Sequence, residues 1–313
     1  MTSGFSSEWL SLREPIDHRS RNADIKSQVS KYFANFLVSP DQPLKVLDLG
    51  CGTGSNLRAV ASLLPDFQHW TLTDHDLNLL YAARDALQQW SDTQLLDSGI
   101  ELKGLDQVPH SVSSLSSHRN KGEPRPMLLQ YLGKTLKIEF CQIDLAIDIE
   151  HLLGRSYDLV TAAAFFDLVS ENWIKRFCEN LQTAFYTALT YNGVEQWLPE
   201  CHVDRDVLKA FHQDQKRDKG FGNATGPLAT EVLVAYLKAN QFVSEVASSP
   251  WILKGRSDIA LMQSLAVGSA DAVRRTGVLQ ESVIKQWIER NKPIERCEIG
   301  HCDLWAYKKR SSP

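Results

Sequence analysis

An acidic residue and three glycines follow one another at the spacing Asp48-x-Gly50-x-Gly52-x-Gly54. The apolar residues just before Asp48 read as a buried parallel strand, and after Gly54 apolar residues recur at helical spacing. Glycine has no Cβ, so this backbone can turn sharply and approach a ligand closely, while the helix that follows presents free amides at its N-terminus. The segment therefore predicts a binding turn for a nucleotide-type cofactor at the carboxyl end of a strand.

A second carboxylate lies where such a cofactor would need it. Asp74 ends a short predicted strand, 70–73, that follows the glycine turn. The two hydroxyls of a ribose can both donate to one carboxylate, which explains an acidic residue at this position. Asp76, two residues later, is expected to cap the next helix, whose apolar face runs over residues 77–87.

The spacing of the glycines distinguishes between two cofactor classes. A dinucleotide fingerprint, G-x-G-x-x-G, would need glycine where this chain has Ser55, which opposes a nicotinamide oxidoreductase. The pattern from Asp48 to Gly54 instead resembles motif I of the class I (Rossmann-like) S-adenosylmethionine (SAM) dependent methyltransferases. Two further segments, Trp9-Leu-Ser-Leu-Arg-Glu-Pro and Lys219-Gly-Phe-Gly, resemble a bacterial branch of this superfamily, of small-molecule type. The resemblance covers about residues 43–191, and it implies SAM as cofactor and methyl transfer as activity.

The resemblance also implies which residues contact SAM. The turn after the third strand reads the adenine in this family, and the end of the fourth strand faces the transferred methyl group. The implied cofactor residues are Asp48, Gly50, Cys51, Gly52, Thr53, Gly54, Asp74, His75, Asp144, Leu145 and Ala162.

Alternating strand and helix patterns set the expected fold. Strands are predicted at 45–49, 70–73, 136–143, 157–162 and 184–190, with helices between them, which indicates a doubly wound α/β architecture. The resemblance implies a mostly parallel seven-stranded sheet with helices on both faces. A helix near 283–288 and a late antiparallel strand at 297–307 complete it. Residues 1–313 are expected to form one methyltransferase domain.

Three segments exceed the minimal fold. Residues 1–42 form a helical extension of the kind that closes as a lid. Arg21 is the candidate for the SAM carboxylate, with Arg13 and Arg19 as alternatives, because a guanidinium can bind a carboxylate bidentately. The alternative interpretation of these arginines is a solvated helix start. The insertion 91–135 reads as decoration, with possible extra strands at 100–103 and 127–132. Residues 192–313 supply an acceptor lid and the C-terminal part of the sheet.

Three residues are candidates for handling the methyl acceptor. Asp167 follows the fourth strand, where a carboxylate could accept a proton or orient the acceptor; alternatively, it caps the helix near Glu171. Tyr191 follows the fifth strand. His212 opens a charged, glycine-bounded segment, 212–227, that is either a lid whose imidazole removes a proton or a charged surface loop.

Composition limits the remaining function classes. The formal charge of −4 argues against broad phosphate-backbone binding, so nucleic acid is an unexpected partner. The chain shows neither a signal core nor an apolar run of membrane length, which predicts a cytoplasmic protein without a membrane partner. Six cysteines form no C-x-x-C pair, so no metal site is expected.

The substrate class follows from what is missing. After the fourth strand, Ala162-Ala-Ala-Phe-Phe lacks the Asn/Asp-Pro-Pro-aromatic motif of enzymes that methylate exocyclic amines of bases. A small-molecule acceptor, methylated on O or N, is therefore preferred. Methylation of a protein or RNA, and SAM binding without catalysis, stay open as alternatives, and the sequence leaves the oligomeric state undetermined.

Overall fold

The computed structural model describes residues 5–91, 122–290 and 295–309. The chain divides into two compact units. One, the glycine-loop unit, contains Ser27–Ala162. The other, the C-terminal unit, contains Glu8–Lys26 and Ala163–Pro313.

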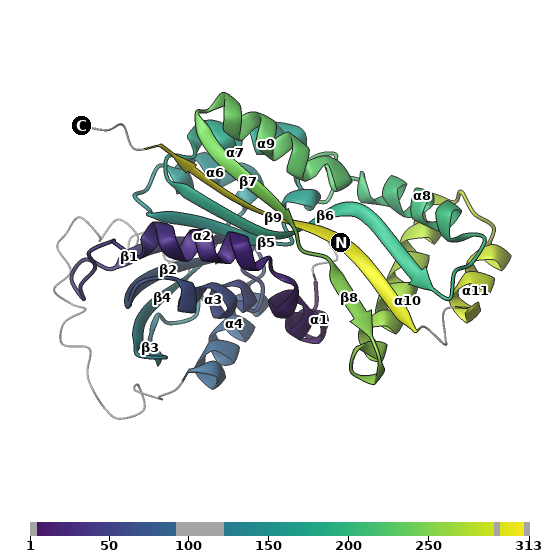
Figure 1. Ribbon diagram of the computed structural model, residues 1–313, viewed down its shortest axis with the longest axis horizontal. Helices are drawn as coiled ribbons and strands as arrows, with labels where there is room; N and C mark the ends of the chain where they lie inside the picture. The colour runs from purple at the N-terminus through teal and green to yellow at the C-terminus, as the bar shows by residue number, and fades with distance from the viewer. Residues whose placement is uncertain (1–4, 92–121, 291–294, 310–313) are drawn as a thin grey trace. The chain divides into compact units, whose positions relative to one another are not determined.

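The glycine-loop unit is built on a parallel sheet. Its strands are β1 (Leu44–Leu49), β2 (Phe67–Asp74), β3 (Met127–Tyr131), β4 (Lys134–Gln142) and β5 (Leu159–Ala163). They lie in the order β3-β4-β2-β1-β5, with β1 parallel to β2 and β5, β2 parallel to β4, and β3 antiparallel at the edge (Figure 1). Parallel strands share one carboxyl edge, so the turns that leave β1, β2, β4 and β5 lie along it.

Helices follow the strands of this unit, and α4 and α6 begin at side-chain caps. The helices are α3 (Ser55–Val60), α4 (Leu77–Trp90) and α6 (Leu145–Leu153), and α2 (Ala23–Phe33) precedes β1. Asp76 accepts from the Asn78 amide at the start of α4, and Asp144 accepts from the Ala146 amide at the start of α6. The cap predicted for Asp76 is confirmed.

The C-terminal unit is built on antiparallel strands. They are β6 (Ala184–Leu198), β7 (Phe242–Ser248), β8 (Trp251–Lys254) and β9 (Arg296–Lys308), and β9 is antiparallel to the other three. The expected antiparallel late strand is therefore confirmed. Strand β6 is irregular: the four residues from Thr187 to Thr190 oppose three of β9, and the five from Tyr191 to Glu195 again oppose three.

The helices of this unit are α1 (Ser7–Ser20), α7 (Glu171–Asn180), α8 (Asp204–Gln215), α9 (Ala229–Ala239), α10 (Ile259–Thr276) and α11 (Glu281–Arg290). Helix α9 packs on α7, β6 and β7, while α10 packs on α8 and α11 (Figure 1). A short 3-10 turn, Phe166–Leu168, precedes α7 and is anchored by the Phe166 ring, which contacts Trp173, Phe177 and Phe185. This buried cluster fixes the position of Asp167.

The α/β class and the parallel strands expected from the sequence are confirmed, but several expectations are wrong. The described residues form nine strands rather than the seven that the resemblance implies, and one of them, β3, confirms the possible extra strand at 127–132. Strand β6 continues to Leu198 instead of ending at 190, so Tyr191 lies within a strand. His212 lies on α8, not in a loop, and Ser170 rather than Asp167 caps α7. The possible strand at 100–103 lies outside the described residues.

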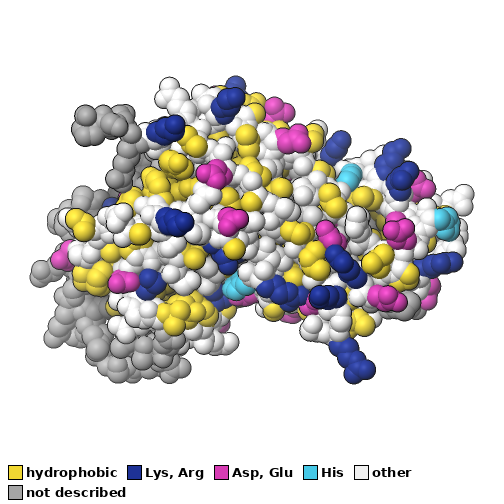
Figure 2. All heavy atoms as spheres, in the orientation of Figure 1, with side chains coloured by type: hydrophobic (Ala, Val, Ile, Leu, Met, Phe, Trp, Pro, Cys, Tyr) yellow, Lys and Arg dark blue, Asp and Glu magenta, His cyan; other side chains and the backbone are white. Residues whose placement is uncertain are grey.

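Surface features of the described chain are unremarkable. Acidic and basic side chains are interspersed on the face shown in Figure 2. Over residues 5–91, 122–290 and 295–309, no helix has both the length and the apolar character that crossing a membrane requires. Within the same ranges, no three His, Cys, Asp or Glu side chains are grouped so that they could hold a metal ion.

Candidate functional site

The glycine turn between β1 and α3 is tight and needs its glycines. Gly50, Gly52 and Gly54 have φ values of 60°, 53° and 76°, in the left-handed region that favours glycine. The Cys51 amide donates to the Thr73 carbonyl (2.8 Å), which fixes the turn against β2. A Cβ on Gly54 would lie 3.3 Å from Leu87 Cδ1, so α4 packs directly behind the turn.

Asp74 is held at the same turn. Its Oδ2 accepts from the Gly52 amide and its Oδ1 from the Asp76 amide, both at 3.0 Å, and the side chain is almost completely buried. His75 Nδ1 lies 3.3 Å from Asp74 Oδ1, and this hydrogen bond raises the pKa of His75. A carboxylate is thus fixed at the end of β2 beside the glycines, as the sequence predicted.

Asp48 and Thr53 are the remaining polar residues at the turn. Asn56 Nδ2 donates to Asp48 Oδ1 (2.6 Å) and to Thr161 Oγ1 (3.1 Å), which joins β1, α3 and β5 through buried side chains. Thr53 Oγ1 is buried without a hydrogen-bond partner among the described residues. A buried hydroxyl of this kind favours a ligand group at the turn, because leaving it unpaired costs free energy.

The other predicted cofactor residues of this unit lie along the same edge. Asp144 is exposed and follows β4, and Leu145 is buried behind it. Ala162 is buried near the end of β5, where its register partner on β1 is Leu49. The fold therefore brings together all the cofactor residues that were predicted in the glycine-loop unit.

The C-terminal unit holds Arg21, the candidate for the SAM carboxylate. It is 5% exposed and lies over the Tyr186 ring, with 6.0 Å between its Cζ and the ring centroid. Burial alone would lower its pKa, but the negative character of Tyr186 and Asp303 raises it, so the guanidinium stays charged. Its Nε and Nη1 have no hydrogen-bond partner in the described chain.

The two alternative arginines are already engaged. Arg13 Nε lies 3.0 Å from Asp17 Oδ2, and Arg19 Nη2 lies 2.7 Å from Asp258 Oδ2. Of the three candidates, Arg21 has donors to spare for an anion.

Asp167 is a buried carboxyl group in the turn before α7. It is 8% exposed, and burial raises its pKa to about 6, although hydrogen bonds from its own amide and the Tyr191 amide oppose the rise. The charges of Lys219 and Arg13 also oppose it. A carboxyl that titrates near neutrality can accept or donate a proton under ordinary conditions.

Tyr191 and His212 are in direct contact. Tyr191 Oη lies 3.0 Å from His212 Nε2 and 3.0 Å from Glu195 Oε1. Burial raises the pKa of Tyr191 and lowers that of His212. Burial also raises the pKa of Glu195 to about 7, against the opposing hydrogen bonds from Tyr191 and Trp197.

Sequence reasoning missed Glu195. Residues four apart in a regular strand are about 13 Å apart, so no strand pattern would pair Glu195 with Tyr191. The two meet because the five residues from Tyr191 to Glu195 oppose only three residues of β9. Only the geometry of β6 could have identified this contact.

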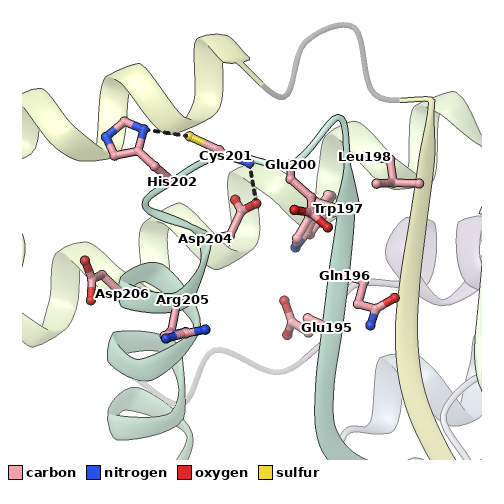
Figure 3. Close-up of a pocket in the computed structure, with 10 residues that line it drawn as sticks. All are labelled: Glu195, Gln196, Trp197, Leu198, Glu200, Cys201, His202, Asp204, Arg205 and Asp206. Carbon is pink, nitrogen blue, oxygen red and sulfur yellow. Dashed lines mark hydrogen bonds between the residues drawn. The ribbon is translucent and has the colours of Figure 1, made fainter.

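Glu195 also lines a cavity of about 510 Å³ between the end of β6 and the start of α8 (Figure 3). In this view Glu195 projects from β6 towards α8, which contributes Arg205. Both carboxylate oxygens of Asp204, which also lines the cavity, already accept hydrogen bonds: one from Trp287 Nε1 and one from the Cys201 amide, each at 2.7 Å.

Comparisons with known proteins give likeness only in structure. No protein-family model matches the chain, and a search of curated proteins finds no match. One similar structure is the plantazolicin methyltransferase BpumL with S-adenosylhomocysteine (SAH), at 13% identity and TM-score 0.43, covering 97% of this chain and 88% of that chain. Another is Haemonchus contortus phosphoethanolamine N-methyltransferase 2 with phosphomonomethylethanolamine and SAH, at 10% identity and TM-score 0.41, covering 96% of this chain and 57% of that one.

A third is a cyclopropane-fatty-acyl-phospholipid synthase-like protein from Lactobacillus casei, at 13% identity and TM-score 0.40, covering 94% of this chain and 99% of that chain.

Proposed function

We propose that this protein is a SAM-dependent methyltransferase that acts on an O or N atom of a small molecule. The observation that carries the proposal is the glycine turn, where three left-handed glycines lie beside a buried carboxylate, Asp74, at the carboxyl edge of parallel strands. Ligands of α/β sheets bind at this edge.

The donor and acceptor groups at the turn fit SAM. Asp74 suits the ribose diol, since its oxygens can accept further hydrogen bonds besides those from the backbone. At the turn, Thr53 Oγ1 is a buried donor that lacks a partner in the described ranges. Within the C-terminal unit, the same holds for the Nε and Nη1 atoms of Arg21. We assign the methionine carboxylate to Arg21 and the adenine to the turn at Asp144 and Leu145.

SAM supplies an electrophilic methyl group on sulfur, and the protein must align the acceptor and remove one proton. Asp167, Tyr191 and His212 are proposed for these tasks. The pKa of Asp167, about 6, and the lowered pKa of His212 leave both groups able to take a proton near neutral pH. The Tyr191 hydroxyl orients the imidazole through their 3.0 Å contact.

Two measurements test the proposal. Calorimetric titration should show binding of SAH and not of NAD; the reverse would make the protein an oxidoreductase. Incubation with methyl-labelled SAM and an extract of the source cells should then place label in the small-molecule fraction.

The labelling result also separates the alternatives. Label only in macromolecules would indicate a protein or RNA acceptor. Binding of SAH without any label would indicate a SAM-binding protein that does not catalyse methyl transfer.

A further inference from the structure

One hydroxyl group joins two titratable side chains in the C-terminal unit. Tyr191 Oη lies 3.0 Å from both Glu195 Oε1 and His212 Nε2. A phenol has one proton to donate, so it can donate to only one of these two partners at a time. The other partner must then donate to the phenol oxygen.

The two hydrogen bonds therefore allow two arrangements of the same protons. In the first, Glu195 is protonated and donates to Tyr191, which donates to Nε2 of a neutral His212. In the second, an imidazolium donates to Tyr191, which donates to the Glu195 carboxylate. Passage from the first to the second breaks the Glu195 O–H bond and forms a new Tyr191 O–H bond. It also breaks the old Tyr191 O–H bond and forms the Nε2–H bond.

We propose that Glu195, Tyr191 and His212 share one proton and relay it between the imidazole on α8 and the cavity at the end of β6. Glu195 thereby acts through Tyr191 as a positioning residue for the proton chemistry of His212. The inference rests on the proposed methyl transfer in one respect: the methyl acceptor loses one proton in each turnover, and the relay would carry that proton away. The proton that the three side chains share is present in the protein before any substrate binds.

The surroundings of the relay favour a mobile proton. Lys216 lies near His212 and disfavours the imidazolium, while a hydrogen bond to the Gly193 backbone favours it. Asp167 acts on Tyr191, whose ring also lies 6.2 Å from the His301 ring. Burial is the largest influence on His212 and also disfavours the imidazolium.

Both ends of the relay reach a place where a proton can be exchanged, His212 at the surface and Glu195 at the cavity. His212 is half-buried, and Glu195 lines the cavity of about 510 Å³ together with Glu200, Arg205 and Asp206 (Figure 3). Trp197 donates to Glu195 and holds the carboxyl group at the cavity wall. A proton can therefore leave through either end.

The test is a pH titration of the His212 ring by NMR in the full-length protein, with the resonance assigned from His212→Gln. In coupled sites, each group reports the titration of the pair. We expect the wild-type His212 signal to titrate in two steps. Tyr191→Phe should give one step, and Glu195→Gln should give one step with a midpoint lower by about one pH unit, since a nearby carboxylate raises an imidazole pKa.

Glu298→Gln is the matched control. Glu298 lies on the adjacent strand β9 and pairs with Arg296 at 2.9 Å, outside the relay, so this variant should keep both steps. A single step at the same pH in wild type, Tyr191→Phe and Glu195→Gln would overturn the relay. Calorimetric binding of SAH is measured on the same proteins: loss of binding in the wild type would refute the proposed function and leave the NMR result standing.

Discussion

At the scale of single residues, the two sets of carboxyl groups differ in their surroundings. Asp74 accepts from two backbone amides at the glycine turn. Asp167 and Glu195 are also hydrogen-bonded, but burial dominates and raises their pKa values to about 6 and about 7. The first environment suits a fixed hydrogen-bond acceptor, whereas the second suits groups that exchange protons.

Replacing Asp74 tests the ribose assignment. Asp74→Asn keeps an oxygen for the Gly52 amide but removes the charge, so SAH affinity should fall by about 1.5–3 kcal/mol, the range for a hydrogen bond to a charged group. Calorimetric titration measures it. Asp85→Asn, on the exposed face of α4, should leave the affinity unchanged. Equal affinities in the two variants would mean that the ribose binds elsewhere.

At the scale of elements, one buried carboxylate organises the start of α2 and the middle of β6. Asp303 on β9 is fully buried, and its oxygens accept from the Asn22 amide (2.8 Å) and the Leu189 amide (3.0 Å). Leu189 has a φ of 58°, which costs free energy in a residue with a Cβ. The hydrogen bond to Asp303 stabilises this strained position and thereby the irregular path of β6.

Removing the charge of Asp303 should therefore destabilise the protein strongly. Asp303→Asn removes the buried charge that accepts from the Asn22 and Leu189 amides, and losing hydrogen bonds to a charged group costs about 1.5–3 kcal/mol. Asp271→Asn breaks an exposed pair with Arg274 (2.7 Å) and should cost less than about 1 kcal/mol. Urea denaturation gives both free energies of unfolding; similar values for the two variants would contradict the anchoring role.

The strands also show where sequence patterns are enough to predict the bounds of an element. The strand predicted at 45–49 is observed as Leu44–Leu49, because apolar parallel strands beside capped helices leave a clear periodic signal. Strand β6 extends beyond the predicted end at 190, and Asn192-Gly193 belongs to the bulge that opposes Gly300. A Cβ on Gly300 would overlap Asn192 Oδ1, so a contact distant in sequence makes the bulge possible.

At the scale of the whole molecule, the two units separate two kinds of chemistry. The glycine-loop unit contains the turn and carboxylate proposed for the cofactor, whereas the C-terminal unit contains the buried groups proposed for proton handling. This second unit also encloses His301, which is 6% exposed and lies 5.0 Å from the Trp251 ring. Burial, and then the charge of Arg13, lowers the pKa of His301 from 6.5 to about 3.

The stability of the fold should therefore depend on pH through His301. Its folded pKa lies below the unfolded value, so the contribution is complete above pH 6.5. This contribution to the free energy of unfolding is lost as the pH falls from 6.5 towards 3, because in that range only the unfolded chain binds the proton. The loss is up to about 1.4 kcal/mol for each pH unit. Urea denaturation between pH 7 and 5 should show a weaker loss in His301→Gln than in wild type or in His18→Gln. Identical slopes in all three would exclude His301 as the cause.

The two extra residues between Tyr191 and Glu195 make the length of this segment as important as its composition. With them, Tyr191 and Glu195 behave as next neighbours on one side of β6, since their partners on β9, His301 and Ile299, are only two positions apart. Loss of a single residue, such as Gly193, would turn Glu195 and Trp197 to the other side, because strand side chains alternate. A homologue shorter by one residue here would keep the strand and lose the proton relay, so segment length marks which relatives share this chemistry.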